Sequence, residues 1–462
     1  MEPVAKVSIV STDGHAVLPA ELWPEYLERR FHEYLPALRA DDAINRRSMY
    51  PLNDAMMLPA LDVFDPDGVY RAGGWEGAWD ADVRLAELDR EGIAAELVYH
   101  GFFRVADLGF SVMNAIYPDD LVDAGARAHN RWAFDTFGAQ ADRFLLVGAI
   151  GTARDLDGAI AEIDWIADHG FVGSYAPGFL GIPGLPPLDD GYWDRFWASC
   201  AERGVAMIVH GGYGLTQGYA FDQIAATCEK VDAAGGDHMD LVAALAQGIF
   251  SERFFADLQH RRAMWRLMLG GVFDRHPTLK LMMAEVRADW LPETLAYLDA
   301  AYDEHRVDLA TRRRPSEWWE SNCLAGVSFM HKAEIEIRDD IGVDHMTFGR
   351  DYPHAEGTWP NTVDYLRDLF AGVPAPDVRK ILGENAIRFF GLDPVTIHGI
   401  AEQVGPTVEQ LTGGAPDIDP LLVAHLDTRS GYLKPSERGS RLGELDELLR
   451  DDLARYAAGA RR

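Results

Sequence analysis

The sequence predicts a parallel (β/α)8 barrel, and two features of its 462 residues lead to this fold. Eight short apolar runs recur along the chain and are almost continuous rather than alternating, which is typical of strands covered on both faces. Amphipathic helical patterns separate these runs, and strands that alternate with helices form a parallel sheet. A doubly wound open sheet is the alternative, but eight strands favour a closed barrel.

The predicted strands follow one another at intervals from the N-terminus to residue 351. They cover residues 7–12, 94–100, 144–150, 170–176, 205–210, 279–285, 323–329 and 345–351. Clear helical patterns precede the second, fourth and fifth strands, at residues 82–92, 156–170 and 189–204. The second of these helices ends on Gly170, a residue that commonly stops a helix.

Three segments fall outside this regular alternation. Residues 16–80 follow the first strand and are rich in Pro, Trp and Tyr, so we expect a cap over the mouth of the barrel. Residues 211–278 follow the fifth strand, and we expect them to begin as a flexible loop. The pattern changes again near residue 396. We therefore predict a barrel domain over residues 1–395 and a helical extension over residues 396–462, packed on the barrel or on a neighbouring subunit.

Composition and charge exclude several classes of protein. The net charge of −31 leaves no basic patch for a phosphate backbone, so we expect no nucleic-acid partner. Cys200, Cys228 and Cys323 form no CxxC pair, which excludes a disulfide or zinc-finger framework and fits a reducing compartment. The N-terminus lacks a signal-peptide pattern, and no apolar run reaches the about 18 residues of a membrane span. We expect a soluble, cytoplasmic protein with no membrane partner.

Residues with metal-binding side chains follow four of the predicted strands. Asp13 and His15 follow the first strand, His210 ends the fifth, Glu285 ends the sixth and Asp351 ends the eighth. The C-terminal ends of barrel strands meet at one face, where the active sites of this fold lie. Alternate residues of an extended chain point the same way, so Asp13 and His15 can reach one ion. Mixed oxygen and nitrogen ligands suit Zn²⁺, Mn²⁺ or Fe²⁺ with an open position for water.

These residues also carry a resemblance to a known family. The chain resembles the amidohydrolase superfamily, in particular the amidohydrolase-2 branch that includes aminocarboxymuconate semialdehyde decarboxylase and γ-resorcylate decarboxylase. The resemblance covers most of residues 7–392 and rests on the segments STDGH, RLAELDREGIAAELVYH, HNRWAFDTFGAQADRFLLVGAI, MIVHGG, GGVFDRHPTLKLMMAE, ADWLPETLAYLD and FGRDYPHAEGTWPN. It implies a distorted barrel with a mononuclear or binuclear metal centre, whose ligands fall on Asp13, His15, His210 and Asp351. In hydrolytic relatives the residue at Asp351 takes a proton from metal-bound water.

The chain departs from the family pattern at three places. Its first motif is DxH rather than the common HxH, so one ligand is anionic and the site is harder. Ala284 and Glu285 stand where decarboxylating relatives often place a Gly-His pair, and we expect Glu285 to be both a metal ligand and a catalytic residue. The end of the fourth strand has no lysine, which argues against a carbamylated-lysine bridge between two metals. We expect one or two divalent transition-metal ions per chain, Zn, Mn or Fe.

Further candidates lie close to the same strand ends. His260, on a predicted helix before the sixth strand, is either an exposed or capped helix residue or a catalytic one, as a second-metal ligand with Glu285 or a substrate contact. The candidates for substrate binding are His100, Tyr175, Tyr213, Arg287, Arg350 and His354. Either arginine could hold a substrate carboxylate through two parallel hydrogen bonds. Arg350 could equally form a surface ion pair, and His354 could cap the turn that precedes it.

Three functions are consistent with these features. The first is a metal-dependent hydrolase that acts on an amide, ester, lactone or thioester of a bulky, partly apolar small molecule. The second is a non-oxidative, metal-dependent decarboxylase of an aromatic or unsaturated carboxylic acid. The third is a non-catalytic binding protein that has kept the fold. We expect the hydrolase, because Glu285 stands in place of the family histidine, and the resemblance implies a homo-oligomer, with a dimer as the default.

Overall fold

The structure is a computed structural model of the chain. It describes residues 6–43, 61–101, 117–179, 181–214, 233, 258–328, 330–354, 357–414, 417–433 and 442–460. The predicted cap and the predicted loop after the fifth strand are therefore described only in part.

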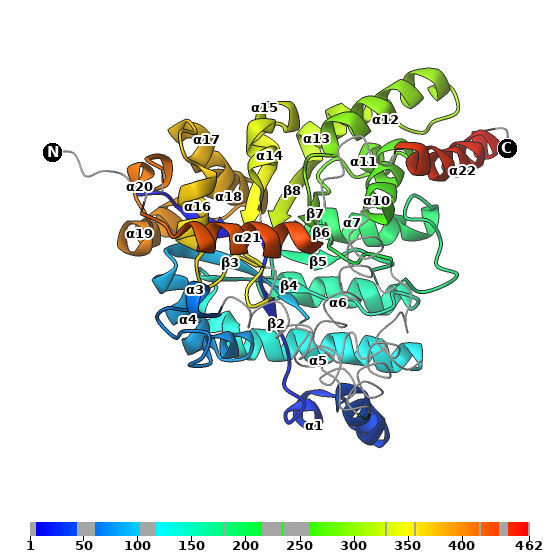
Figure 1. Ribbon diagram of the computed structural model, residues 1–462. Helices are drawn as coiled ribbons and strands as arrows, with labels where there is room; N and C mark the ends of the chain where they lie inside the picture. The colour runs from blue at the N-terminus through cyan, green and yellow to red at the C-terminus, as the bar shows by residue number, and fades with distance from the viewer. Residues whose placement is uncertain are drawn as a thin grey trace.

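Eight parallel strands follow one another around the barrel in chain order, which confirms the predicted fold (Figure 1). These strands are β1 (Ile9–Ser11), β3 (Ile93–His100), β4 (Phe144–Gly148), β5 (Gly173–Tyr175), β6 (Ala206–Val209), β7 (Leu281–Val286), β8 (Cys323–Ser328) and β9 (Met346–Gly349). A short additional strand, β2 (His15–Ala16), extends the first strand and pairs with the end of β3.

Hydrogen bonds between the first and last strands close the ring. The Thr12 amide donates to the Phe348 carbonyl at 2.9 Å, and the His15 amide donates to the Tyr352 carbonyl at 2.6 Å. Gly14 and Tyr352 also form a parallel bridge. The segments that follow β1 and β9 therefore lie side by side. The candidate ligands carried by the first and last strands are neighbours for this reason.

Alternation along the strands separates the two sides of the barrel wall, because successive strand residues point to opposite faces. On β3, Leu97 and Tyr99 belong to an inner cluster of apolar side chains, whereas Val98 belongs to the outer core beneath the helices. All of β3 is buried. A strand covered on both faces explains why its sequence is almost continuously apolar.

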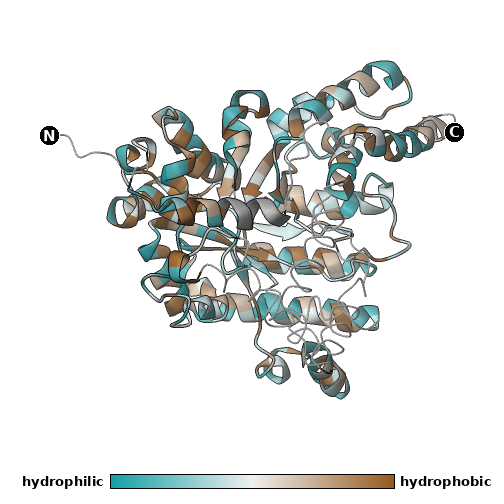
Figure 2. Ribbon diagram, viewed as in Figure 1, coloured by the Kyte–Doolittle hydropathy of each residue, from teal (hydrophilic) through white to brown (hydrophobic). Residues whose placement is uncertain are grey.

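Helices surround the barrel and cover the outer face of the strands. They include the three predicted from the sequence, and their bounds are α4 (Ala81–Arg90), α5 (Asp119–Phe137), α6 (Leu156–Asp168), α7 (Asp194–Arg203), α10 (Leu258–Leu269), α11 (Val272–Arg275), α12 (Leu291–His305), α13 (Pro315–Asn322), α14 (Lys332–Glu336), α15 (Arg338–Ile341), α16 (Thr362–Leu369), α17 (Ala375–Arg379) and α18 (Asn385–Phe390). Helices α5 and α6 carry both teal and brown residues in Figure 2, as expected when one face packs on the sheet.

Local sequence signals fix the ends of these helices. The Asp80 side chain accepts hydrogen bonds from the first amides of α4, and Asp155 does the same for α6. Gly204 ends α7 in the left-handed conformation, with φ of 70°. Shorter helical turns also occur among the described residues: η1 (Arg29–Tyr34), η3 (Gly74–Ala78), η5 (Gly138–Gln140), η6 (Gly191–Trp193), η8 (Val343–His345) and η9 (Lys380–Glu384).

The described part of the predicted cap contains α1 (Trp23–Tyr26), η1, α3 (Leu61–Phe64) and η3. Trp23 is fully buried, and its indole donates to the Leu18 carbonyl at 3.1 Å. The Tyr352 hydroxyl donates to the carbonyl of Gly74 in η3. Part of this segment therefore lies beside the loop that carries Asp351.

The C-terminal segment is helical, as α19 (Pro394–Val404), α20 (Val408–Thr412), α21 (Pro420–Leu433) and α22 (Leu442–Ala460). The expected boundary at residue 396 falls inside α19, whose Ile397 and Ala401 pack with the inner cluster of the barrel. Helix α22 lies beside α10, and its Asp452 accepts hydrogen bonds from Arg262 and Arg266 (Figure 1). The extension packs on the barrel, and its status as a separate domain stays a prediction.

Two expectations from composition concern the cysteines and the membrane. Cys200 and Cys323 are buried and free, and Cys228 lies outside the described residues. In the ranges that the structure describes, no helix combines the length and the apolar character needed to cross a bilayer.

Candidate metal centre

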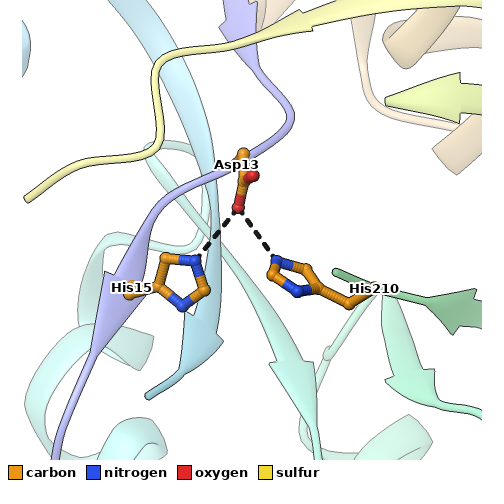
Figure 3. A group of neighbouring side chains, drawn as sticks. All are labelled: Asp13, His15 and His210. Carbon is orange, nitrogen blue, oxygen red and sulfur yellow. Dashed lines mark hydrogen bonds and ion pairs between the residues drawn. The ribbon is translucent and has the colours of Figure 1, made fainter. Parts of the chain in front are cut away.

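The DxH motif places two side chains at the C-terminal mouth of the barrel. His15 begins β2 and Asp13 precedes it, so both side chains leave an extended segment on the same side. Asp13 Oδ1 lies 3.3 Å from His15 Nε2 and 3.3 Å from His210 Nε2. Figure 3 shows the carboxylate between the two imidazoles. The predicted neighbourhood of Asp13, His15 and His210 is therefore present.

Asp351 approaches this group from the other end of the chain. It follows β9, and its Oδ1 lies 3.1 Å from His15 Nε2. His354 Nδ1 lies 2.9 Å from the same Asp351 oxygen, and the His354 ring stacks on His15 with centroids 4.1 Å apart. Asp351 has φ of 54°, in the left-handed region that a non-glycine residue rarely adopts. This backbone conformation ends the strand and turns the carboxylate toward His15.

The electrostatics of the group favour positive charge. All of these side chains are buried. Burial alone raises the pKa of Asp13, but the charge of His210 and hydrogen bonds with His15 and His210 outweigh it and hold the pKa well below its usual value. Burial lowers the pKa of His15, yet Asp13 and Asp351 raise it well above its usual value. Two carboxylates thus create a site where a cation is stabilised.

The donor geometry also fits a divalent metal ion. The Nδ1 atom of His15 lies 3.3 Å from the His100 carbonyl, to which it donates in the tautomer that leaves Nε2 toward Asp13 and Asp351. Ligand atoms about 2.1 Å from one ion are themselves about 3.0–3.4 Å apart, which matches the separations of 3.1–3.3 Å among these side chains. Asp13, His15 and His210 form one candidate ligand group, and His15, Asp351 and His354 form an overlapping one.

Glu285 lies behind His210 rather than beside Asp13. Its Oε2 is 3.1 Å from His210 Nδ1, while the opposite nitrogen of the same ring faces Asp13. We expected Glu285 to be a metal ligand. Its position is that of the carboxylate that typically orients a metal-binding histidine from behind, and its role as a direct ligand stays a prediction. Glu285 has φ of 54°, and Gly211 leaves the space for its carboxylate, because a Cβ there would meet Oε2 at 1.8 Å.

Replacing Glu285 by glutamine is expected to weaken metal binding by about 10- to 100-fold, because the His210 ring loses the charged partner that orients it. The measurement is a chelator competition titration, with Glu304→Gln as the matched control, since the Glu304 side chain is 79% exposed. Complete loss of metal would instead make Glu285 a direct ligand. Unchanged affinity would remove it from the centre.

His260 contacts the centre through the backbone. It is buried on α10, and its Nε2 donates to the His210 carbonyl at 2.6 Å. This placement excludes the exposed helix position that we considered. It gives the His260 ring a contact with the strand end that carries His210, and its role as a second-metal ligand or substrate contact stays a prediction.

Ser328 is a site residue that the sequence did not suggest. It ends β8, and its hydroxyl donates to Asp13 Oδ2, the oxygen opposite the one that faces the histidines. The signal was present, because Ser328 follows an apolar strand as the other candidates do. Its hydroxyl fixes the Asp13 carboxylate, a role that depends on a contact with the segment that follows another strand.

The two candidate arginines are engaged by protein carboxylates. Arg350 is fully buried and forms ion pairs with Glu91 and Glu96 at 2.8 Å and 2.5 Å. Arg287 pairs with Asp289 at 3.2 Å and with Glu334 at 3.3 Å. The guanidinium of Arg350 is held by Glu91 and Glu96, and its contact with substrate stays a prediction. Arg287 lies next to the mouth and keeps its expected role only as a prediction.

The carboxylate that holds Arg287 provides a pH-dependent test of the surrounding structure. Burial raises the pKa of Glu334, but the charge of Arg287 and hydrogen bonds from His331 and Ala288 lower it to about 2. A folded-state pKa below the unfolded value stabilises the protein above about pH 4.5, and this stabilisation is lost as the pH falls toward 2.

Glu334→Gln is therefore expected to lower the free energy of unfolding by about 3 kcal/mol at pH 7, with a difference from wild type that shrinks below about pH 4.5. Denaturant unfolding at several pH values measures it, and Glu304→Gln at an exposed position serves as control. A difference that does not change with pH would contradict this assignment.

Three aromatic or histidine candidates line the same end of the barrel. The Tyr175 hydroxyl donates to the His100 carbonyl at 3.3 Å, and its ring lies 5.8 Å from that of His210. The His100 ring packs edge-on against Tyr175 at 4.5 Å. The Tyr213 hydroxyl donates to the Pro177 carbonyl at 2.6 Å. Their positions are compatible with contact to a bound molecule, and their roles remain predictions.

The parallel barrel and the cluster of carboxylates and imidazoles define a metal-dependent barrel enzyme. Residues 13–392 match the family model described as Amidohydrolase, and the chain belongs to this family. A curated relative, the gamma-resorcylate decarboxylase of Rhizobium sp. strain MTP-10005, is 25% identical over 327 residues, which cover 68% of this chain and 87% of that protein. The resemblance to the amidohydrolase-2 branch is confirmed.

Solved structures with low sequence identity share the fold. An amidohydrolase from Mycobacterium avium subsp. paratuberculosis K-10 has a TM-score of 0.57 and 20% identity, over 83% of this chain and 99% of that chain. A dihydroxybenzoic acid decarboxylase from Polaromonas sp. JS666 has a TM-score of 0.52 and 18% identity, over 84% of this chain and 97% of that chain. Both support the barrel architecture across most of the sequence.

Proposed function

We propose that this chain is a metal-dependent, non-oxidative decarboxylase of an aromatic or unsaturated carboxylic acid. The observation that carries the proposal is two overlapping buried groups at the mouth of an amidohydrolase barrel, Asp13 with His15 and His210, and His15 with Asp351 and His354. The relative from Rhizobium is named a gamma-resorcylate decarboxylase, and the Polaromonas decarboxylase was solved with manganese and the inhibitor 2-nitroresorcinol. These relatives support the decarboxylase over the hydrolase that the sequence favours.

Four side chains would hold one divalent transition-metal ion: Asp13, His15, His210 and Asp351. When bound, such an ion binds and polarises oxygen atoms of the substrate as a Lewis acid. Manganese is supported by the Polaromonas relative. Zinc and iron also suit mixed carboxylate and imidazole ligands.

The remaining chemistry is a proton delivered to carbon. Loss of CO2 breaks a carbon–carbon bond and leaves the electron pair on the substrate carbon, which must then take up one proton. We assign the transfer of this proton to Asp351, which would pass one proton to the carbon in each turnover and recover one from solvent. His354 Nδ1, at 2.9 Å from Asp351 Oδ1, orients that group. The family histidine missing at Glu285 is therefore not required for this step.

Hydrolysis loses its main support through the position of Glu285. We favoured hydrolysis because this carboxylate could bind the metal or steer water. Glu285 contacts His210 Nδ1, where it orients the imidazole for either reaction. Hydrolysis and non-catalytic binding become outcomes of the test below, and the homodimer, the small-molecule substrate and the cytoplasmic location stay predictions.

Product analysis separates these functions. Manganese-loaded protein would be incubated in D2O with 2,6-dihydroxybenzoate, 5-carboxyvanillate and related aromatic acids. We expect CO2 release and one deuterium on the carbon that carried the carboxylate. Turnover of aryl esters or lactones without CO2 from any acid would establish a hydrolase instead, and no turnover of either set would favour a binding protein.

A further inference from the structure

A cluster of buried charges connects two of the three segments that carry the candidate ligands, those of His15 and Asp351. The cluster consists of Arg84, Glu91, Glu96 and Arg350, each at most 2% exposed. Arg84 lies on α4, Glu96 lies in the middle of β3, and Arg350 directly precedes Asp351. None of these residues belongs to the proposed ligand set.

Arg84 holds the DxH segment. Its Nη1 donates to the His15 carbonyl at 2.6 Å, while its Nε and Nη2 donate to Glu96 Oε2 at 2.9 Å and 2.6 Å. A Cβ on Gly14 would lie 2.7 Å from Arg84 Nη2 and from the Glu96 carboxyl carbon. The guanidinium and carboxylate are thus packed directly against the residue between Asp13 and His15.

Arg350 holds the segment that follows the last strand, β9. Its Nε and Nη2 donate to the two oxygens of Glu96 at 2.5 Å and 3.2 Å, and its Nη1 donates to Glu91 at 2.8 Å. Coulombic attraction to Glu96 and Glu91 outweighs burial and raises the pKa of Arg350, so this side chain stays charged. Asp351, the next residue, has the strained φ of 54°, and a neighbour fixed by three hydrogen bonds helps to maintain it.

Glu96 therefore joins both arginines at one carboxylate. We infer that Glu96, Arg84 and Arg350 form a positioning network, which sets the separation of the His15 and Asp351 segments and so determines the metal affinity of the centre. The inference rests on the proposed function only in requiring that the centre binds a metal ion.

The energetics of burial favour this role over simple stabilisation. Charged groups lose their hydration when buried, and well-packed apolar residues of similar size are often at least as stabilising. What an apolar cluster cannot supply is directed hydrogen bonding. Arg84 uses its planar fork to reach the Glu96 carboxylate and the His15 carbonyl together, a geometry that lysine does not reproduce.

The test compares metal affinity in Arg84→Lys and Glu96→Gln with that in Asp452→Asn. Asp452 is a matched control, because it is also a buried carboxylate that joins two arginines, Arg262 and Arg266, between α10 and α22. Manganese dissociation constants would be measured by calorimetry, with folding checked by circular dichroism. We expect about 10- to 100-fold weaker binding in the two network variants and a change within about twofold in the control.

Affinities of Arg84→Lys and Glu96→Gln within about twofold of wild type would overturn the inference and leave the network a structural element. Equal weakening in Asp452→Asn would overturn it as well, since the effect would follow from general destabilisation. If Glu96→Gln does not fold, Arg84→Lys decides. Wild-type protein that binds manganese but releases no CO2 would refute the proposed decarboxylase alone, whereas wild-type protein that binds no metal would refute both.

Discussion

Asp351→Asn is expected to lower kcat by about 1000-fold or more while the barrel stays folded, because the amide can neither carry nor deliver the proton that the substrate carbon requires. Asparagine has almost the same shape as aspartate, and it tolerates the left-handed backbone conformation that Asp351 adopts. The variant should therefore keep the local structure. Steady-state kinetics of CO2 release measures the loss, and circular dichroism with thermal unfolding reports the fold.

Asp344→Asn is the matched control for this variant. Asp344 lies in η8 just before β9 and forms an exposed ion pair with Lys380, far from the C-terminal mouth of the strand. We expect its activity to remain close to that of wild type. An Asp351→Asn variant with wild-type turnover would contradict the proposed mechanism.

His15→Ala is expected to reduce metal affinity by more than about 100-fold, beyond the range for residues that act on a ligand from behind. His15 Nε2 is the atom that approaches both carboxylates, at 3.3 Å from Asp13 and 3.1 Å from Asp351. Its loss leaves two buried carboxylates without the imidazole that contacts them both. Calorimetric titration with manganese measures the effect.

The control for His15→Ala is His305→Ala at the end of α12, where the side chain is 38% exposed. It should bind metal as wild type does. Metal affinity equal to wild type in His15→Ala would show that the ion binds elsewhere.

The arrangement of Asp13, His15, His210 and Asp351 was predictable because each residue marks the C-terminal end of an apolar run. In a parallel barrel the C-terminal ends of all strands meet at one face. A position at such an end therefore implies that these residues lie close together. The DxH spacing also predicts that the side chains of Asp13 and His15 leave the chain on the same side. These inferences depend on local pattern and fold class, which a single sequence conveys.

The roles of Glu285, His260 and Arg350 depended on three-dimensional contacts that no spacing reveals. Glu285 faces His210 Nδ1, and His260 donates to the His210 backbone. Arg350 meets Glu96 across the barrel wall. Glu96 did carry a signal, since a charged residue in the middle of an apolar strand needs a buried partner. The partner itself could not be identified from the sequence.

The choice between hydrolysis and decarboxylation also depends on a contact that the sequence does not reveal. In the sequence, Glu285 stands where a histidine is common, and this substitution alone favours hydrolysis. The observed contact makes Glu285 a partner of His210, which is compatible with decarboxylation. The curated relative over 68% of this chain is named a decarboxylase. Residue identity at a family position was therefore less informative than the atom that the residue contacts.

Metal content of the wild-type protein tests the central claim most directly. Protein purified without chelators would be analysed by plasma mass spectrometry, before and after addition of manganese. The proposed centre predicts about one equivalent of a divalent transition metal per chain, carried by one set of carboxylate and imidazole ligands. Protein that contains no metal and takes up none on addition would contradict it.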